Sequence, residues 1–568
     1  MAVIHAHLTR SFPHATLQAG PTSHRDVGHW RTAVARLVVA LVAGWLAGCG
    51  TGGGGGSGGT AGGLQPIPPP VVAVVPAQVT VAKGRAVTLS AVVVGAGPEV
   101  AWSVEGGPTD GMVDAQGVYT APTVVPDHPV IVRATSAADA RGAATAVVRV
   151  IVGDNLKVGP NQSVSPTGVT ASTFSGGQRG AAVHGSTVYM VWSDNSRGND
   201  DVYLAVSCDR GLTFGTPMLV NDDVGTTPQV APTVAVDGGG RAIIAWIDGR
   251  NHPLTLPSPQ AYDVYLAAAT ANDCGSVAVG PNLLVASVGM SGDPSVALAV
   301  DWFGRVYLAW PDDGQGSTTA TIRMTRGTPT AGMDVTFTAP VPVSDVGMTY
   351  QSRPAIAARD DGTIVVAWND QRSGSQDVYW RRGRFAADGT VQFAASEVVV
   401  NTATEGDQVS PSVAIDRNGT AFVAWGQQLG LERRHIYLAS SAATDLAVSA
   451  NFPVVADSLD ADENFPSLVV DADGGITIAF ADNRTCLNTF PGRCAPGAQG
   501  TGPTDVYTVR SLDGGLTFRE VRLNDDPPNL DPKLHGRPSV AVDDVGRVFA
   551  VWTDDRSGLS QPFMARVE

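Results

Sequence analysis

Apolar and polar positions follow one repeating order along most of the chain. From residue 180 onward a phrase recurs: Pro-x-Val-Ala-x-Asp, a glycine-containing turn, an apolar run that ends in Trp, and then Asp. The repeat defines units of roughly 60 residues, which is the length of a repeated supersecondary unit. The residues at the seven Trp positions are Trp192, Trp246, Trp310, Trp368, Trp425, Phe480 and Trp552.

Each unit predicts about four β-strands. In the fourth unit we expect strands at 355–358, 363–368, 377–380 and 396–401, with a turn at Asp361-Gly362. The second of these strands is apolar on both faces, which is typical of a strand buried between neighbouring sheets. Radially stacked four-stranded sheets bury their strands in this way. The pattern therefore predicts an all-β, seven-bladed β-propeller over residues 154–568.

The two ends of this region predict how the ring closes. The last unit ends at Glu568 after three strands. Residues 155–158 resemble the fourth strands of other units, such as 282–285 and 521–524. We therefore expect this N-terminal strand to complete the last blade.

Residues 71–153 predict a separate, smaller β domain. Short runs rich in Val and Thr are separated by Gly and Pro, which is typical of a β-sandwich. The stretches around Trp102 and Tyr119 resemble bacterial Ig-like domains of surface proteins. The segment contains no Cys, so the disulfide of antibody domains is absent, and we interpret the domain as a spacer.

The first 48 residues predict an export signal. An apolar run at 37–47 follows Arg31 and Arg36, and it is too short to span a bilayer. The run ends in Leu-Ala-Gly-Cys49, which resembles the bacterial lipobox. That resemblance implies removal of residues 1–48 and attachment of lipid to Cys49.

Two further features bear on the anchor. Gly50 follows the Cys, where the family places Asp as an inner-membrane retention mark, so the resemblance implies the outer membrane. Residues 49–70 are rich in Gly and then Pro, which predicts a flexible tether. We expect a monomer held to the cell envelope through its lipid anchor.

Charge and composition argue against some classes of binding partner and cofactor. The 53 acidic residues outnumber the 37 basic ones, for a net charge of −16, which argues against a nucleic-acid partner. No His-x-x-x-His or Cys-x-x-Cys spacing is present, so we expect no zinc site and no cofactor. Asn221-Asp222-Asp223 and Asn524-Asp525-Asp526 offer clustered oxygens for calcium, but solvated loops are the better interpretation.

Two hairpins carry a specific motif, Ser-x-Asp-x-Gly-x-Thr-Phe, which resembles the Asp-box of sialidase-like (BNR-repeat) propellers. In the family this motif is structural and lies away from the active site. Its carboxylate and hydroxyls bond the backbone of a turn in which Gly permits a positive φ. The matching residues are Ser207, Asp209, Gly211, Thr213 and Phe214, and Ser511, Asp513, Gly515, Thr517 and Phe518.

A second repeated pattern follows the Trp position. Asp lies two residues after it in six units, an Arg follows, and Asp-Val-Tyr then begins the third strand. We interpret these charges as surface salt bridges, each worth about 0–1 kcal/mol. The Asp residues are Asp194, Asp248, Asp312, Asp370, Asp482 and Asp554.

The resemblance to sialidases raises the question of an active site. Alignment of the first strands places Arg179, Arg353 and Arg537 at one position. They are candidates for an anion-binding site at the mouth of the channel or for a sialidase-type arginine triad, and structural pairing with nearby Asp residues is the other interpretation. The Phe-Arg-Ile-Pro phrase of sialidases is missing, and no Glu lies beside Tyr350. Glu405 and Glu463 are candidate carboxylates, and no catalytic residue is assigned.

The cysteines predict local crosslinks. Cys486 and Cys494 flank a short stretch of the long insertion in the sixth unit, and export permits a disulfide between them. Cys208 and Cys274 fall in equivalent hairpins of neighbouring units and are a weaker candidate pair.

These features together favour a cell-surface lipoprotein whose propeller binds a glycan or a protein without catalysis. A sialidase-type glycoside hydrolase with a diverged site is one alternative. A structural envelope protein with no small ligand is the other.

Overall fold

The computed structural model describes residues 68–568 apart from several short segments. These segments are 154–155, 166–170, 173–178, 253–260, 274–275, 291–293, 314–318, 331–332, 346–348, 404, 430–432, 444–446, 456–460, 485–503 and 527–533. Within the described part of the chain, no helix is long and apolar enough to cross a membrane.

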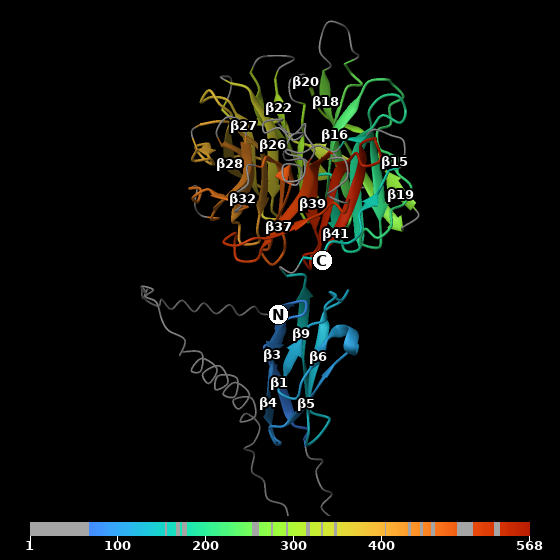
Figure 1. Cartoon of the computed structure of the whole chain (residues 1–568), viewed down its shortest axis with the longest axis vertical. Coiled ribbons are helices and arrows are strands. Elements are labelled where there is room, and N and C mark those ends of the chain that lie inside the picture. The colour runs from blue at the N-terminus through green and yellow to red at the C-terminus, as the bar shows by residue number, and fades with distance from the viewer. Residues whose placement is uncertain are drawn as a thin grey trace, which may run out of the picture. The chain divides into compact units, whose positions relative to one another are not determined.

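The N-terminal domain is a small β-sandwich, drawn in blue in Figure 1. Its sheets have the strand orders β2-β9-β8-β5, β3-β7-β6 and β1-β4. The side chains between the sheets are mostly Val, and Tyr119 is fully buried among them. The strands are β1 (Val71–Val75), β2 (Gln78–Ala82), β3 (Ala86–Thr88), β4 (Ser90–Val94), β5 (Val100–Val104), β6 (Met112–Val113), β7 (Val118–Thr120), β8 (Val130–Ser136) and β9 (Ala143–Ile151).

The rest of the described chain forms seven antiparallel sheets of four or five strands, equal in number to the sequence repeats. We number them in chain order: sheet 1 is β11–β15, sheet 2 β16–β20, sheet 3 β21–β25, sheet 4 β26–β30, sheet 5 β31–β34, sheet 6 β35–β38, and sheet 7 β39–β41 with β10.

The strand bounds of sheets 1–4 are β11 (Ala171–Ser172), β12 (Ala181–His184), β13 (Thr187–Asp194), β14 (Asp201–Ser207), β15 (Met218–Leu219), β16 (Gln229–Val236), β17 (Ala242–Asp248), β18 (Tyr262–Asp273), β19 (Ser276–Val279), β20 (Leu283–Met290), β21 (Ala297–Val300), β22 (Val306–Asp312), β23 (Thr321–Pro329), β24 (Val335–Phe337), β25 (Val341–Pro342), β26 (Gln351–Ala358), β27 (Thr363–Asp370), β28 (Asp377–Phe385), β29 (Val391–Phe393) and β30 (Val398–Val399).

The strand bounds of sheets 5–7 are β31 (Gln408–Ile415), β32 (Ala421–Leu429), β33 (Arg433–Ser441), β34 (Phe452–Pro453), β35 (Glu463–Val470), β36 (Ile476–Asp482), β37 (Asp505–Ser511), β38 (Arg519–Arg522), β39 (His535–Val542), β40 (Val548–Asp554), β41 (Gln561–Val567) and β10 (Gln162–Ser163).

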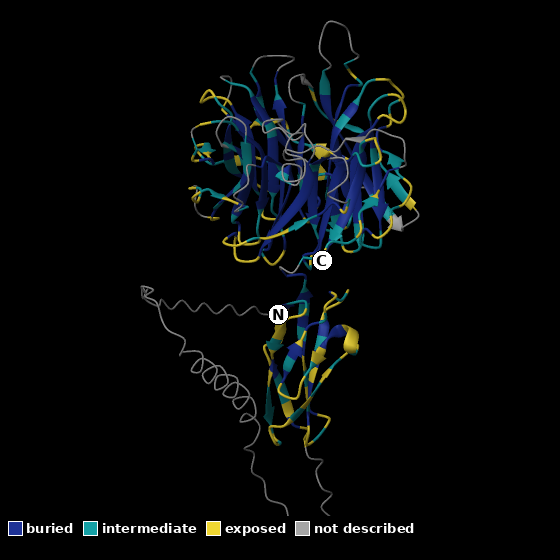
Figure 2. Cartoon of the chain, in the orientation of Figure 1, coloured by how far each residue is buried: buried dark blue, intermediate teal, exposed yellow. Residues whose placement is uncertain are grey.

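The strand that carries the Trp position is buried along almost its whole described length in every sheet. Every residue of β17, β36 and β40 is buried, and Figure 2 shows these inner strands in dark blue. Alternation of apolar and polar residues is therefore missing from them, because both faces of the strand pack against neighbouring sheets. The large side chain at each Trp position lies here and is fully buried.

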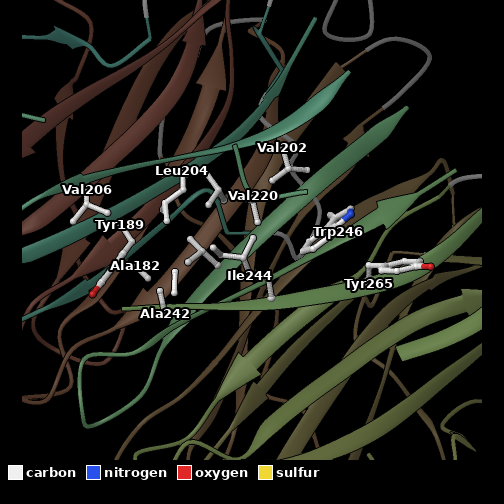
Figure 3. Packing of buried hydrophobic residues seen from close by; sticks show 14 residues of the cluster. Ala182, Tyr189, Val202, Leu204, Val206, Val220, Ala242, Ile244, Trp246 and Tyr265 are labelled. Carbon is white, nitrogen blue, oxygen red and sulfur yellow. The ribbon is translucent and has the colours of Figure 1, made fainter. Parts of the chain in front are cut away.

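Apolar clusters join the sheets into a closed ring. The cluster in Figure 3 lies between sheets 1 and 2, where Leu204 and Val206 pack near Ile244 and Trp246. Equivalent clusters join each later pair of sheets. The remaining cluster packs Phe549 and Met564 of sheet 7 against Met190 of sheet 1. Because every sheet is covered on both faces, the arrangement is a β-propeller.

The ring closes through a strand from the far end of the chain. β10 pairs antiparallel with β41, and Val158 forms a bridge with Val567. The sequence prediction that an N-terminal segment completes the last sheet is confirmed. The regular pairing lies at Gln162–Ser163, a few residues after the predicted strand, and Asn155 is outside the described residues.

Asn161 reinforces this closure. Its Nδ2 donates to the Leu523 carbonyl at 2.8 Å, and its Oδ1 accepts from the Asp525 N–H at 2.8 Å and from Arg556 Nη2 at 2.9 Å. Asn282 makes the corresponding bonds between sheets 1 and 2. The closing segment thus reproduces a contact that other sheets make locally.

We expect Asn161→Ala to lower the free energy of unfolding by about 1–3 kcal/mol, because the variant leaves backbone and guanidinium groups unpaired. Equilibrium urea unfolding measures this change. Asn418→Ala, at an exposed turn, is the control and should change stability by less than about 0.5 kcal/mol. Equal effects of the two substitutions would contradict the role given to Asn161.

Candidate functional site: the central channel and its mouth

The first strands of all seven sheets line a central channel. The channel holds a cavity of about 260 Å³ that is lined by Ala, Val, Leu and Ile residues and by Arg179. More polar than apolar surface faces it, because backbone groups and the guanidinium line it as well as aliphatic side chains. A single cation with no other charged residue in the lining is the feature of this cavity that requires an explanation.

Arg179 lies two residues before the start of β12, and its side chain reaches across the channel. Its Nη2 donates to the carbonyl of Val413, in sheet 5, at 3.2 Å, and its backbone N–H donates to Thr233 Oγ1 at 3.0 Å. Within the described residues it makes no ion pair, and its exposed surface faces the cavity. Burial lowers the pKa of Arg179, because the charged guanidinium is poorly solvated there.

Arg353 and Arg537 occupy equivalent β-bulges at the start of β26 and β39. Both have a left-handed backbone, with φ of 49° and 52°, and each precedes a proline. The strand register shifts at both positions, so each bulge turns its side chain out of the regular ladder. Ala231, Ser410 and Phe465 hold the same conformation in sheets 2, 5 and 6.

The register separates Arg179 from this pair. Arg353 and Arg537 lie two residues before the first regular pair that follows the bulge in each strand, whereas Arg179 is directly next to Gly180, whose carbonyl accepts from the Val191 N–H. Arg179 is thus offset by one residue from the expected common position. The sequence before β12 has no X-Pro dipeptide to mark this position, so counting from the motif misplaces Arg179.

Four bulge residues form a continuous arc over sheets 4–7, which we call the bulge arc: Arg353, Ser410, Phe465 and Arg537. Arg353 Nη1 donates to Ser410 Oγ at 3.3 Å, and the Arg537 guanidinium lies 6.0 Å from the centre of the Phe465 ring. The arc places both arginines on the same side of the ring, although their units are not adjacent in sequence.

The candidate carboxylates differ in their surroundings. Glu405 is exposed, and its carbonyl accepts a hydrogen bond from Gln408 Nε2 at 3.1 Å. Glu463 is fully buried and lies opposite Asp482 in the register of sheet 6. Its Oε2 accepts from the Ile436 N–H at 2.8 Å, and its Oε1 has no hydrogen-bond partner within the described residues.

Asp482 is the most perturbed carboxyl group near the bulge arc. Burial raises the pKa of Asp482 to about 7, and the Glu463 carboxylate adds to this rise, while hydrogen bonds from Arg484 oppose it. His435 lies 3.7 Å from Glu463, measured from Nδ1 to Oε1. Sheets 2 and 4 place Gln, a neutral donor, where sheet 6 has Glu463.

The Asp residues after the Trp positions are buried except for Asp312, which is partly exposed, and this corrects the expectation of surface salt bridges. Asp248 is fully buried; its Oδ2 accepts from Trp246 Nε1 at 2.8 Å and from Arg250 Nη2 at 2.8 Å. Arg250 in turn lies 4.4 Å from the centre of the Tyr265 ring. The sequence pattern could not reveal this burial, because the same spacing also suits an exposed hairpin.

The side chains of the two Asn-Asp-Asp clusters form hydrogen bonds and ion pairs with other side chains of the protein. Asn221 Nδ2 donates to Asp201 at 2.7 Å and to Asp223 at 2.9 Å, and Arg250 pairs with Asp222 at 2.7 Å. The second cluster repeats these contacts: Asn524 bonds Asp505 and Asp526, and Arg556 pairs with Asp525.

His535 joins the second cluster in the place that Gln229 takes in the first. Its Nδ1 donates to the Thr504 carbonyl at 2.7 Å, and its Nε2 lies 3.3 Å from both Asp526 and Asp554. Asp505, Asp526 and His535 together have the spacing of a metal site. Arg522 and Arg556 already pair with these carboxylates, so the cluster does not require a cation for charge balance.

The pKa of His535 follows from this environment. Burial lowers the pKa of His535, but the bonds to Asp526 and Asp554 outweigh it and raise the value from 6.5 to about 10. Protonated His535 therefore places a positive charge between these carboxylates, where other sheets place the amide of a Gln.

The two Asp-box hairpins have the same hydrogen bonds. Asp209 Oδ1 accepts from the Thr213 N–H at 2.8 Å, its Oδ2 accepts from Thr213 Oγ1 at 2.6 Å, and Ser207 Oγ accepts from the Gly211 N–H at 2.8 Å. Asp513 makes the matching bonds with Thr517, which lower the pKa of Asp513 to about 2. Phe214 and Phe518 pack against the clusters between sheets.

Several expected sites lie outside the described residues. These are the lipid-attachment residue Cys49, the Cys486–Cys494 pair, and Cys274, the expected partner of Cys208.

Comparison with known proteins gives a likeness of fold. No family model and no curated protein matches the chain. Among solved structures, an ulvan lyase of polysaccharide lyase family PL25 is similar over 72% of this chain and 95% of its own, at 11% identity and a TM-score of 0.47. The alpha-L-arabinanase of Penicillium chrysogenum is similar over 60% of this chain and 93% of its own, at 16% identity and a TM-score of 0.38.

A sialidase of Trypanosoma rangeli, a mutant with trans-sialidase activity, is similar over 72% of this chain, at 11% identity and a TM-score of 0.38. This chain covers 59% of that protein. Because these sequence identities and TM-scores are low, the assignment of a β-propeller fold rests on the seven sheets and their packing in this structure.

His535→Gln tests the protonated histidine with a side chain that three other sheets use at this position, Gln229, Gln351 and Gln408. The folded pKa lies above the unfolded value of 6.5, so the stabilisation is complete below pH 6.5 and is lost as the pH rises through about 10. We expect the wild-type free energy of unfolding to fall by a few kcal/mol across this window. The free energy of unfolding of His535→Gln should change less with pH across this window.

Urea unfolding at pH 6, 8 and 10 measures the slope. His128→Gln, at an exposed histidine of the sandwich, should keep the wild-type slope. If the free energy of unfolding of His535→Gln depends on pH as strongly as that of the wild type, His535 is not the source of the pH dependence.

Proposed function

We propose that the chain is an exported lipoprotein, anchored through Cys49 to the outer membrane. In this proposal residues 71–153 are an Ig-like spacer, and the seven sheets are the blades of a sialidase-like propeller of the Asp-box class. The lipobox resemblance, the Gly-rich tether and the two Asp-box hairpins support it.

We further propose that the propeller binds an anionic glycan at the channel mouth without cleaving it. The observation that carries this proposal is Arg179, a guanidinium in an apolar channel with no carboxylate partner among the described residues. An unpaired buried cation is costly to keep in a fold. A carboxylate or sulfate of a bound ligand would offset that cost through a bidentate interaction.

The bulge arc adds the remaining chemistry of such a site. Arg353 and Arg537 would bring two further positive charges, and Phe465 an aromatic ring, to the end of the channel at which the first strands begin; none of the three lines the Arg179 cavity itself. Aromatic and cationic side chains together suit a sugar ring that carries an acid group.

A sialidase-type hydrolase with a diverged site is the second candidate. The observation that favours it is the Glu463–Asp482 pair, since a carboxyl group with a pKa of about 7 is suited to act as a general acid. Both carboxyl groups are fully buried, which leaves the pair no open face toward a substrate and favours binding over catalysis.

Arg179→Met tests the binding proposal. We expect the affinity for acidic oligosaccharides, identified on a glycan array and measured by calorimetry, to fall about tenfold or more. We also expect the melting temperature to rise, because an apolar side chain replaces an unpaired buried charge.

Arg141→Met, at an exposed ion pair of the sandwich, should leave the affinity unchanged. Unchanged affinity in Arg179→Met would refute the channel site. The absence of any bound glycan for the wild type would favour a structural envelope protein.

Asp482→Asn tests the hydrolase. On the binding proposal, neither the wild type, Asp482→Asn nor Arg353→Ala cleaves a fluorogenic sialoside. Cleavage by the wild type that both substitutions reduce at least a hundredfold would replace the binding proposal with the hydrolase.

A further inference from the structure

The turn between β21 and β22 carries two exposed aromatic residues, Trp302 and Phe303. Their side chains are 63% and 65% exposed, and no other Trp or Phe of the described residues is exposed to this degree. Large aromatic side chains are normally buried, so an exposed adjacent pair calls for a reason.

The fold does not require aromatic residues at this turn. Asp301 Oδ1 accepts from the backbone N–H groups of Phe303 and Arg305, and Asp237 makes the same two bonds in sheet 2. Asp416, Asp471 and Asp543 do so in sheets 5, 6 and 7. The tips of the corresponding turns are Gly238–Gly239, Asp360–Asp361, Arg417–Asn418, Ala472–Asp473 and Asp544–Val545.

Trp302 is held rigidly by three other sheets. Its backbone N–H donates to Asp360 Oδ1 of sheet 4 at 2.8 Å, and its backbone carbonyl accepts from the Gly238 N–H of sheet 2 at 3.0 Å. The indole packs so closely on Gly238 that a Cβ there would lie 2.3 Å from the ring. The His184 ring of sheet 1 is centred 6.4 Å away. One side of the indole is therefore fixed, and the other is open.

Phe303 extends the same apolar surface. The Arg305 guanidinium lies 5.4 Å from the centre of its ring and also donates to the Asp360 carbonyl. Charged and polar groups thus border the two rings, and exposed Asp360 places a carboxylate beside them.

The size of the patch indicates a small occupant. Aromatic side chains present about 150–250 Å² each, so two that are about two-thirds exposed offer roughly 200–300 Å². A stable protein interface needs about 800 Å² from each partner. The patch suits a compact ligand with an apolar face and hydroxyl groups at its edge, and the neighbouring Asp360 disfavours a negatively charged one.

We propose that Trp302 and Phe303 form a stacking site for a neutral pyranose unit of a polysaccharide. Because the first strands run from the bulge arc to these turns, the site lies at the end of the ring opposite the bulge arc. The Arg179 cavity reaches toward the same turns, since Val300 lines it, but neither Trp302 nor Phe303 does. The proposal does not depend on the anionic site. Apolar C–H groups of the sugar would pack on the open face of the indole, with its hydroxyls near Asp360 and His184.

Affinity electrophoresis of the full chain tests the site, with gels that contain neutral polysaccharides: xyloglucan, galactomannan or mixed-linkage β-glucan. We expect at least one of these to retard the wild type. Trp302→Ala should weaken this binding about tenfold or more, Phe303→Ala should weaken it less, and Trp302→Tyr should retain most of it.

Two matched controls separate this site from other effects. Leu516→Ala removes an exposed apolar side chain from another turn, and Arg179→Met removes the channel cation; both should bind neutral polysaccharide as the wild type does. Loss of neutral binding in Arg179→Met would show a single shared site and overturn the proposal.

Other outcomes also overturn it. These are no retardation of the wild type by any of the three polysaccharides, or equal retardation of Trp302→Ala and the wild type. Trp302→Ala should also leave sedimentation of the full chain with vesicles and its oligomeric state by light scattering unchanged. A change in either would assign the patch to a membrane or to a second copy of the chain.

Discussion

Burial of both faces of every sheet is the constraint on which the rest of this structure depends. The second strands are apolar on both sides, so a sheet at an open end would expose a whole hydrophobic face to water. Closure of the ring removes both ends at once. The contact between β10 and β41, with Asn161 beside it, holds sheet 7 to a segment that precedes sheet 1 in the chain. The stability of each sheet therefore depends on a pairing that joins the two ends of the propeller.

The same packing leaves polar groups buried at the ends of the strands, and sheets 2 and 4 satisfy them in the same way. The Asp after the Trp position accepts from the indole N–H and from a following Arg, while a Gln on the first strand of the same sheet donates to its carboxylate. Sheets 6 and 7 depart from this scheme with Glu463 and His535. A protonated His replaces the Gln donor directly, whereas Glu463 places a second acid against Asp482 and raises its pKa. These two substitutions change the protonation state of buried side chains, while the backbone of the sheets stays the same.

Departures from the repeat also mark the two proposed sites. Arg179 replaces an apolar residue in the channel, and two of the positive-φ bulges at the start of the first strands carry arginine. In a turn at the other end of these strands, Trp302 and Phe303 replace polar or small residues where Asp301 already determines the shape of the turn. The first site has the charge to take an acidic group, and the second has a fixed aromatic face for a neutral sugar. A polysaccharide-rich surface would present both kinds of ligand.

The sequence by itself determined the all-β character, the seven repeats, the turn positions and the segment that closes the ring, because these follow from local periodicity and turn residues. It also located Arg353 and Arg537 on equivalent strands. Only the tertiary structure decided that Arg179 is displaced by one residue, that Asp248 and four of its counterparts are buried, and that Trp302 is open while seven other Trp residues are enclosed. The reason is physical: spacing along a strand sets which face a side chain takes, but the neighbouring sheets decide whether that face meets water, a charge or another side chain.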